Sequence, residues 1–253
     1  MEEIRKILKM LEEGKITVEE AERLIEAAIK EKEKKRKTSF DFAGIGEIIK
    51  DSISSVFSFI PEIVERIEVK EDIEWSKEKP LILEITGGDV DIFTHEGNMI
   101  AVEGTGHYER IENTIKVAGG DFEIKIPNLL ELKILVRAGD LEGKILAEKF
   151  TLKLDAGDAD INLISKDINV SVKMGDLDLI LENIPEEINI ECKMGDVTLK
   201  LPEDFDGTIH PQIRFGDFSL HKPYKIEGKD YIIGTGEKCK IEIDCRMGDV
   251  KIY

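Results

Sequence analysis

The chain has 253 residues, of which 41% are apolar and 36% are charged, and its formal net charge is −18. The apolar content is that of a folded protein rather than a disordered one. The acidic balance argues against general nucleic-acid binding, which needs a basic surface. No run of about 18 apolar residues predicts a transmembrane helix.

Residues 1–37 predict a helical hairpin. Apolar residues recur at helical spacing, Gly14 can end the first helix, and Thr17–Glu20 has the capping-box form that begins the second. Two short helices cannot bury two apolar stripes alone, so we expect them to pair with a copy, dock on their own chain or hold a partner. The interaction residues predicted here are Ile4, Ile7, Leu8, Leu11, Leu24, Ile25 and Ile29.

Residues 38–68 predict an amphipathic helix, which Pro61 kinks or restarts. Its apolar stripe runs from Ile45 to Ile67, with acidic residues and serines on the other face. We expect it to cover the open end of the following domain. An oligomer contact and a membrane-surface contact through residues 40–67 are the alternatives. The basic run Lys30–Lys37, before it, reads as a solvated helix end or as a contact with an anionic surface.

Residues 69–253 carry a repeat. The dipeptide Gly-Asp occurs eight times, at successive steps of 32, 19, 18, 18, 20, 21 and 32 residues. Apolar residues alternate with period two on both sides of each central dipeptide, so each unit predicts two short strands with one apolar face. The dipeptides are Gly88-Asp89, Gly120-Asp121, Gly139-Asp140, Gly157-Asp158, Gly175-Asp176, Gly195-Asp196, Gly216-Asp217 and Gly248-Asp249.

A period near 20 residues is typical of stacked units that bury a continuous core. The sequence therefore predicts a mainly β fold: a β-solenoid or two-sheet roll of about 20-residue Gly-Asp repeats, preceded by the helical hairpin and the amphipathic capping helix. An antiparallel sandwich of hairpins is the alternative, because its strands show the same alternation. The two 32-residue steps each contain Gly-Thr-Gly, which suggests an extra strand pair near each end.

The Gly-Asp pairs are predicted to be structural corners. Glycine allows a positive φ, and Asp can bond backbone N–H groups within the turn. A basic residue stands two positions before the Gly in five units, and we expect it to pair with the Asp of its own turn, as Lys173 with Asp176. Cation binding is the rival interpretation. The densest acidic group, Asp155, Asp158 and Asp160, lacks a basic neighbour at that position and is the metal site we would expect.

Catalytic chemistry is not predicted. The four histidines are scattered, and no nucleophile motif, phosphate-binding loop or Cys-x-x-Cys occurs. Cys192, Cys239 and Cys245 are interpreted as core thiols. We expect no enzyme activity, no cofactor and no small-molecule site.

Two motifs carry a family resemblance. The stretch "LEEGKITVEEAERLIEA" resembles the SHOCT-like helical hairpin of bacterial proteins, and "MGDLDLIL", "MGDVTLKL" and "MGDVKIY" resemble a β-strand-repeat putative adhesin domain of unknown function. The combination is similar to the YvlB/LiaX group, whose members are linked to cell-envelope stress. The resemblance covers nearly the whole chain and implies no catalytic residues.

The function expected from the sequence is a non-enzymatic scaffold or interaction protein, tied to envelope stress through the resemblance. Its hairpin would mediate self-association or partner docking. A β-roll that binds cations or cationic peptides is the alternative, and peripheral membrane attachment is another. The charged amphipathic N-terminus is unlike a secretory signal, so we expect a cytoplasmic location, with attachment at the membrane surface as a variant. The abundance of Lys and Glu with few amides resembles a thermophile's composition.

Overall fold

The computed structural model describes residues 67–253. The predicted hairpin and residues 38–66 of the predicted amphipathic helix lie outside the described residues and stay predictions, whereas Ile67 and Glu68, predicted as the end of that helix, begin a strand. Within residues 67–253 the chain forms nineteen strands and no helix, which confirms a mainly β domain.

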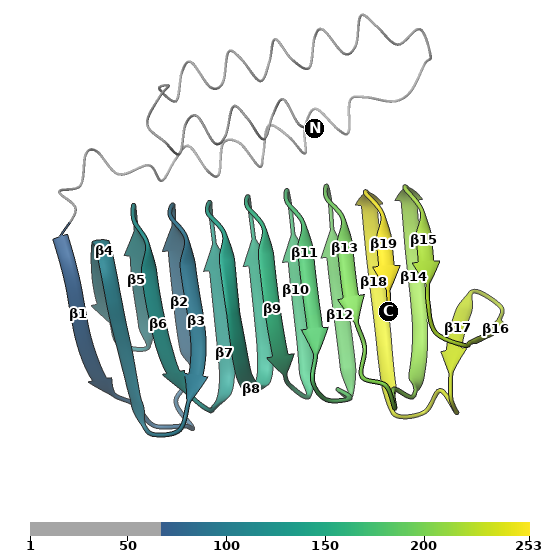
Figure 1. The fold of residues 1–253 in the computed structure, drawn as a ribbon, viewed down its shortest axis with the longest axis horizontal. Coiled ribbons are helices and arrows are strands. Elements are labelled where there is room, and N and C mark those ends of the chain that lie inside the picture. The colour runs from purple at the N-terminus through teal and green to yellow at the C-terminus, as the bar shows by residue number, and fades with distance from the viewer. Residues whose placement is uncertain (1–66) are drawn as a thin grey trace, which may run out of the picture. The chain divides into compact units, whose positions relative to one another are not determined.

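The strands form two layers, sheet A and sheet B, that face each other across the core (Figure 1). Sheet A contains, in spatial order, β1 (Ile67–Glu74), the first part of β4 (Met99–Ile111), β6 (Phe122–Pro127), β3 (Val90–His95), the first part of β8 (Leu141–Leu154), β9 (Ala159–Ile164), β11 (Leu177–Leu181), β13 (Val197–Lys200), β19 (Val250–Ile252) and β15 (Phe218–Leu220).

Sheet B contains the second part of β4 and then β5 (Thr114–Ala118), β2 (Leu81–Thr86), β7 (Leu129–Val136), the second part of β8, β10 (Asp167–Val172), β12 (Glu187–Cys192), β18 (Cys239–Met247), β14 (Gly207–Phe215), β17 (Asp230–Ile233) and β16 (Lys225–Glu227). A strand of sheet B, a Gly-Asp corner and the following strand of sheet A make one coil.

The central strands pair in parallel with strands one coil away. Leu177 of β11, for example, lies opposite Ala159 of β9 on one side and Val197 of β13 on the other. Strands consecutive in the chain lie in opposite sheets here, whereas a sandwich of hairpins would pair them antiparallel. Antiparallel pairing is confined to β1, β4, β16 and β17 with their neighbours.

The order of coils in space differs from their order in the chain at both ends. The coil β2–β3 lies inside the coil β5–β6, and the last coil of the chain, β18–β19, lies between β12–β13 and β14–β15. The two 32-residue steps join coils that are neighbours in space, and they are long because the first also contains β4 and the second also contains β16 and β17. The steps that pass over one coil, from Gly120 to Gly139 and from Gly195 to Gly216, are of 19 and 21 residues. The corner glycines run in the spatial order Gly120, Gly88, Gly139, Gly157, Gly175, Gly195, Gly248 and Gly216.

The core consists of the inward residues that the alternation predicts. In the coil β10–β11, for instance, Ile168, Val172 and Leu177 are each no more than 1% exposed. Burying such a side chain contributes about 1.5–3 kcal/mol, and no single coil could bury its apolar face without its neighbours. Trp75, the only tryptophan of the chain, is 4% exposed and belongs to the same core.

The three cysteines are free and buried, which agrees with their interpretation as core thiols. A hydrogen bond with Cys245, together with burial, raises the pKa of Cys192. Burial raises the pKa of Cys239 to about 12.

Candidate functional site: the Gly-Asp edge and the acidic row

The corner glycines are required by two features of the backbone. Gly175 has a φ of +133°, and a Cβ added to it would lie 1.6 Å from the carbonyl oxygen of Gly157 in the neighbouring coil. Seven of the eight corner glycines have a positive φ. At the eighth, Gly120, a Cβ would meet the carbonyl oxygen of Thr105 at 1.6 Å. Only glycine fits such corners, because other residues lack both the conformation and the space.

The Asp side chains join one coil to the next. The Oδ1 of Asp158 accepts the backbone N–H of Asp176 at 2.8 Å, and the Oδ1 of Asp176 accepts that of Asp196 at 2.8 Å. The same kind of bond, from a backbone N–H to an Asp Oδ1, joins each corner Asp to the corner Asp of the adjacent coil. In spatial order the series begins at Asp89 and ends at Asp217, and we call it the Asp ladder. The sequence predicted a bond within the Asp's own turn; the stacking of coils instead brings the next coil's N–H into reach.

The basic residues before the corners do not pair as expected. Lys173 forms its ion pair with Asp155 of the neighbouring coil, with the Nζ and Oδ1 atoms 2.7 Å apart. Among the described residues, no ion pair joins Lys193, Arg214 or Arg246 to the Asp of its own turn. In parallel stacking the nearest charges are those at the same position of adjacent coils.

The structure does not assemble the expected metal site. Asp155 is engaged by Lys173, Asp158 accepts the N–H of Asp176, and Asp160 points outward from β9. In residues 67–253 no group of three or more His, Cys, Asp or Glu side chains could hold a metal ion.

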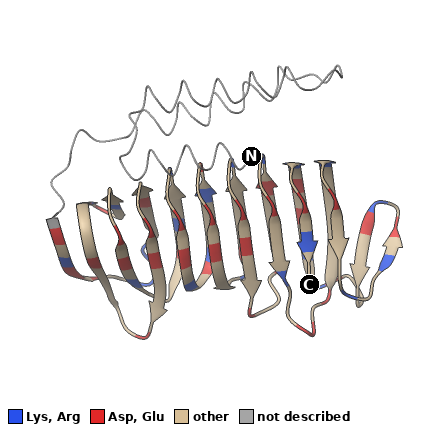
Figure 2. Cartoon of the chain, turned by 45° about the horizontal axis from the view of Figure 1, so that its top comes forward, with Lys and Arg blue, Asp and Glu red and all other residues tan. Residues whose placement is uncertain are grey.

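Asp160 belongs to another arrangement, which we call the acidic row. It runs across the outer face of sheet A, two residues beyond the Asp ladder, and each member lies directly opposite the next on adjacent strands. In spatial order its members are Glu103, Glu123, Asp91, Glu142, Asp160 and Asp178. Figure 2 shows the acidic residues side by side on adjacent strands.

Only the first part of the acidic row is neutralised. Glu103 pairs with Lys70, and Glu123 pairs with Lys125. The other four carboxylates are exposed, and none has an ion-pair partner among the described residues. Like charges directly opposite each other on adjacent strands repel, so this surface favours any cation that reaches it.

A shallow cavity lies where the acidic row meets the Asp ladder. Its volume is about 370 Å³. Gly104 of β4 has no side chain to cover the ring of Phe122, and this opens the depression. The acidic residues that line it are Asp89, Asp91, Glu103, Asp121 and Glu123.

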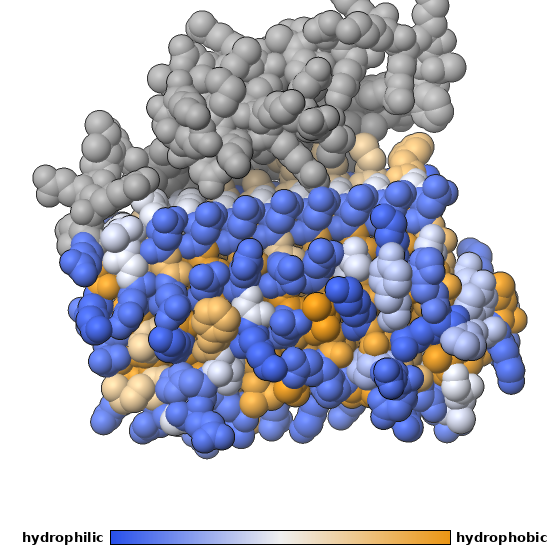
Figure 3. Space-filling view, in the orientation of Figure 1, coloured by the Kyte–Doolittle hydropathy of each residue, from blue (hydrophilic) through white to orange (hydrophobic). Residues whose placement is uncertain are grey.

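Apolar side chains lie beside the acidic row on the outer face of sheet A. Phe93 is 38% exposed, and Leu146, Ile164 and Ile180 are half-buried. Figure 3 shows orange apolar atoms below hydrophilic rows along the upper edge. The surface thus offers negative charge and apolar area side by side.

The sequence contains a signal for the acidic row. An acid follows two residues after the Gly-Asp in five of the eight units, as in "GDLE" and "GDLD", and is replaced by Thr198, Lys251 and Ser219 in the others. The five units follow one another in the chain, and the structure sets their order in space, in which Asp91 lies between Glu123 and Glu142.

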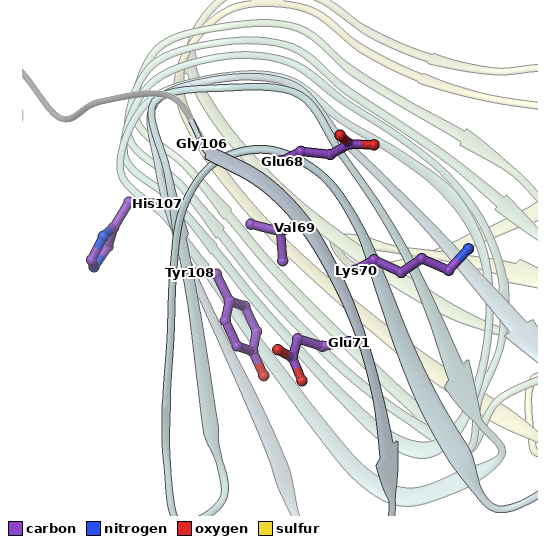
Figure 4. A pocket seen from close by; sticks show the side chains of 7 residues that line it. All are labelled: Glu68, Val69, Lys70, Glu71, Gly106, His107 and Tyr108. Atoms are coloured by element: carbon purple, nitrogen blue, oxygen red, sulfur yellow. The ribbon is translucent and has the colours of Figure 1, made fainter.

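A second cavity, of about 570 Å³, lies between β1 and the second part of β4. Val69, Glu71 and Tyr108 point toward one another there, while Lys70 and His107 point to opposite sides (Figure 4). Burial and the charge of Glu71 raise the pKa of Tyr108. The geometry places the Tyr108 hydroxyl near the Glu71 carboxylate.

The predicted interaction residues of the hairpin, from Ile4 to Ile29, lie outside the described residues. In the described part of the chain no helix is long and apolar enough to span a membrane.

A two-sheet stack of coils with Gly-Asp corners defines a repeat-built β protein. The chain belongs to the Toastrack DUF4097 family, which it matches over residues 76–253. Residues 2–34 match a SHOCT-like domain. Both parts of the resemblance seen in the sequence are therefore confirmed.

The solved structures that are similar to the chain include two described as adhesion proteins. A "putative cell adhesion protein" from Clostridium sporogenes is 17% identical, with a TM-score of 0.41, over 74% of this chain and 98% of that one. A "putative adhesin" from Bacteroides fragilis is 10% identical, with a TM-score of 0.32, over 74% of this chain and 97% of that one. No curated protein matches the chain.

Proposed function

We propose that this protein is a non-enzymatic interaction scaffold whose β domain is a rigid β-solenoid that holds a cationic partner on sheet A. One observation carries the proposal. The carboxylates of Asp91, Glu142, Asp160 and Asp178, which have no ion-pair partner within residues 67–253, lie in a row on adjacent strands, beside the Asp ladder. A partner that brings positive charges relieves their repulsion.

The partner we propose is a basic segment of a peptide or protein rather than a single ion. The carboxylates are spread along the stack at the strand spacing of about 4.8 Å, so they suit charges distributed along a chain. The apolar patch of Phe93, Leu146, Ile164 and Ile180 beside the row supports a partner with apolar side chains as well.

Binding of a fluorescently labelled lysine-rich peptide, measured by anisotropy at low and high salt, tests the proposal. Neutralising the row in the variant Asp91→Asn/Glu142→Gln/Asp160→Asn/Asp178→Asn should weaken binding about tenfold or more, or about 1.4 kcal/mol. The matched control, Glu131→Gln/Glu186→Gln/Glu187→Gln/Glu191→Gln, removes the same charge from exposed positions outside the row. Equal weakening by both variants would show that only net charge matters and would reject the site.

The hairpin supplies the second part of the proposal, self-association or partner docking. The match of residues 2–34 to a SHOCT-like domain supports it. Light scattering of the full chain, with and without Leu8→Glu and Ile25→Glu, should show loss of the oligomer in the variants. If light scattering shows that the wild-type protein is a monomer, self-association is wrong and partner docking is the role that remains for the hairpin.

We also propose a cytoplasmic location, which the three free, buried cysteines support. A role in the cell-envelope stress response is proposed on the basis of the family resemblance. Cell fractionation and an envelope-stress reporter in a deletion strain test these two points. Membrane attachment through residues 40–67 is the remaining alternative; liposome co-sedimentation that is lost on Ile53→Glu would support it.

A further inference from the structure

A row of basic residues crosses the outer face of sheet B in the last three coils of the described stack. Cys192 of β12 lies directly opposite Cys245 of β18, and Cys245 lies opposite Ile213 of β14. Both cysteines are buried, so the residue that follows each of these three positions points outward, because side chains alternate along a strand. In spatial order these following residues are Lys193, Arg246 and Arg214, and we call them the basic row.

Within residues 67–253, no ion pair engages the basic row. Two of its side chains are exposed and the third is half-buried. The ladder carboxylates beside the row bond the adjacent coil instead. The Oδ1 of Asp196 accepts the N–H of Asp249 at 2.8 Å, and the Oδ1 of Asp249 accepts that of Asp217 at 2.9 Å. Like charges on adjacent strands repel, so the basic row favours an anionic partner.

The basic row and the acidic row cannot meet within one molecule. The carboxylates of the acidic row that lack an ion-pair partner in residues 67–253 lie on the outer face of sheet A, from β3 to β11. The basic row lies on the outer face of sheet B, in the coils that follow along the stack (Figure 1). In the coil β10–β11 the base at the equivalent position, Lys173, is already paired with Asp155.

We propose that the acidic row of one molecule binds the basic row of a second copy. This inference rests on the proposed function, because it names the basic partner of the acidic row. Both rows step from strand to strand at the same spacing of about 4.8 Å, so cations and carboxylates of two copies match one to one along the stack. Strands hold both rows in place before contact, which lowers the entropic cost of binding.

The charge of the chain makes this contact selective. Each copy carries a net charge of −18, so two copies repel one another except where a basic surface meets an acidic one. The contact joins two different surfaces, and each copy that binds through one row keeps the other row free. Further copies can therefore add to the first two.

Apolar side chains lie beside both rows. Phe215, next to Arg214, is 55% exposed, and Met247, next to Arg246, is half-buried. The acidic row is flanked by the apolar patch that contains Phe93. A contact between the rows would thus bury apolar area at its centre or rim as well as pair charges, which is the composition of ordinary protein interfaces.

Sedimentation velocity of the full chain tests the proposal. Every sample carries Leu8→Glu and Ile25→Glu, so that the predicted hairpin contact does not contribute. The parent protein should sediment as species heavier than the 28.6 kDa monomer at low salt, and as the monomer at high salt. Suitable concentrations are about 20 mM and about 500 mM, because the latter screens exposed charges beyond a few ångströms. The light-scattering test of the hairpin is made at the higher salt, where the contact between rows is screened.

Two variants separate the rows. The basic-row variant is Lys193→Gln/Arg214→Gln/Arg246→Gln, and the acidic-row variant is the one used in the peptide experiment. Each alone should self-associate at least about tenfold more weakly than the parent. An equal mixture of the two should form a dimer that does not grow, because each supplies the row that the other lacks. The matched control, Lys225→Gln/Lys229→Gln/Lys238→Gln, removes the same charge from exposed positions outside the row and should associate like the parent.

A parent protein that stays monomeric at low salt would overturn the proposal, and so would a mixture of the two variants that stays monomeric. Equal loss of association in the control would also overturn it, because net charge alone would then explain the result. The fluorescence of Trp75 checks that each variant is folded. The lysine-rich peptide separates this failure from that of the proposed function: if the peptide still binds the acidic row, only the contact between copies is wrong.

Discussion

The change Gly175→Ala tests the close stacking of the corners. An alanine Cβ would lie 1.6 Å from the carbonyl oxygen of Gly157, at a φ of +133°. The backbone strain costs about 1–3 kcal/mol. The coils must also separate, which weakens the bond from Gly175 N–H to the Met194 oxygen (3.0 Å) and that from Asp176 N–H to Asp158 (2.8 Å), at about 1 kcal/mol each. We expect a total loss of about 3–5 kcal/mol.

Gly119→Ala is the matched control. Gly119 also has a positive φ, +71°, but a Cβ there meets nothing within 4 Å. Its cost should be the conformational term alone, about 1–2 kcal/mol. Urea denaturation followed by Trp75 fluorescence reports this domain specifically, because Trp75 is the only tryptophan and is buried in its core. Equal destabilisation by the two changes would refute the argument from close approach.

Three further predictions concern the ladder, the core and the thiols. Asp158→Ala removes the acceptor for Asp176 N–H and should cost about 1–2 kcal/mol, whereas Asp158→Asn keeps an oxygen there and should cost less; equal urea midpoints would argue against the ladder bond. Leu179→Ala should cost about 2–5 kcal/mol, while Ile180→Ala, one residue along on the outer face, should cost under about 1 kcal/mol in the same assay. Burial raises the pKa of Cys239 to about 12, so little of it is thiolate at pH 8, and it should react slowly with a disulfide reagent in the native protein and quickly in urea. The Cys192→Ser/Cys245→Ser variant leaves Cys239 as the only thiol. Rapid labelling of that variant in its native state would contradict the burial of Cys239.

Local rules explain why much of the β domain could be predicted. The alternation around each corner placed Leu177 and Leu179 inside and Asp178 outside, because a strand's side chains point to opposite faces. The positive φ of Gly157 and Gly175 follows from glycine's lack of a Cβ. These inferences need only the residues of one unit, and the structure agrees with them.

The partners of the charged residues could not be predicted in this way. Asp176 was expected to bond within its own turn, but Asp158 and Asp196 of the adjacent coils supply its bonded neighbours in the ladder. Lys173 pairs with Asp155 for the same reason. A long side chain at the surface interacts with what stands beside it, and in parallel stacking that is the neighbouring coil.

The sequence by itself determined the repeat, its corners and the apolar face of each unit, because these depend on backbone geometry and on alternation along a few residues. Only the tertiary structure decided which coils are neighbours. The chain can pass over one coil at each end without disturbing the alternation of apolar and polar residues, so no local sequence pattern reveals that it does so. That order sets Asp91 between Glu123 and Glu142 in the acidic row and brings Cys192 against Cys245, neither of which the order of the repeats along the chain specifies.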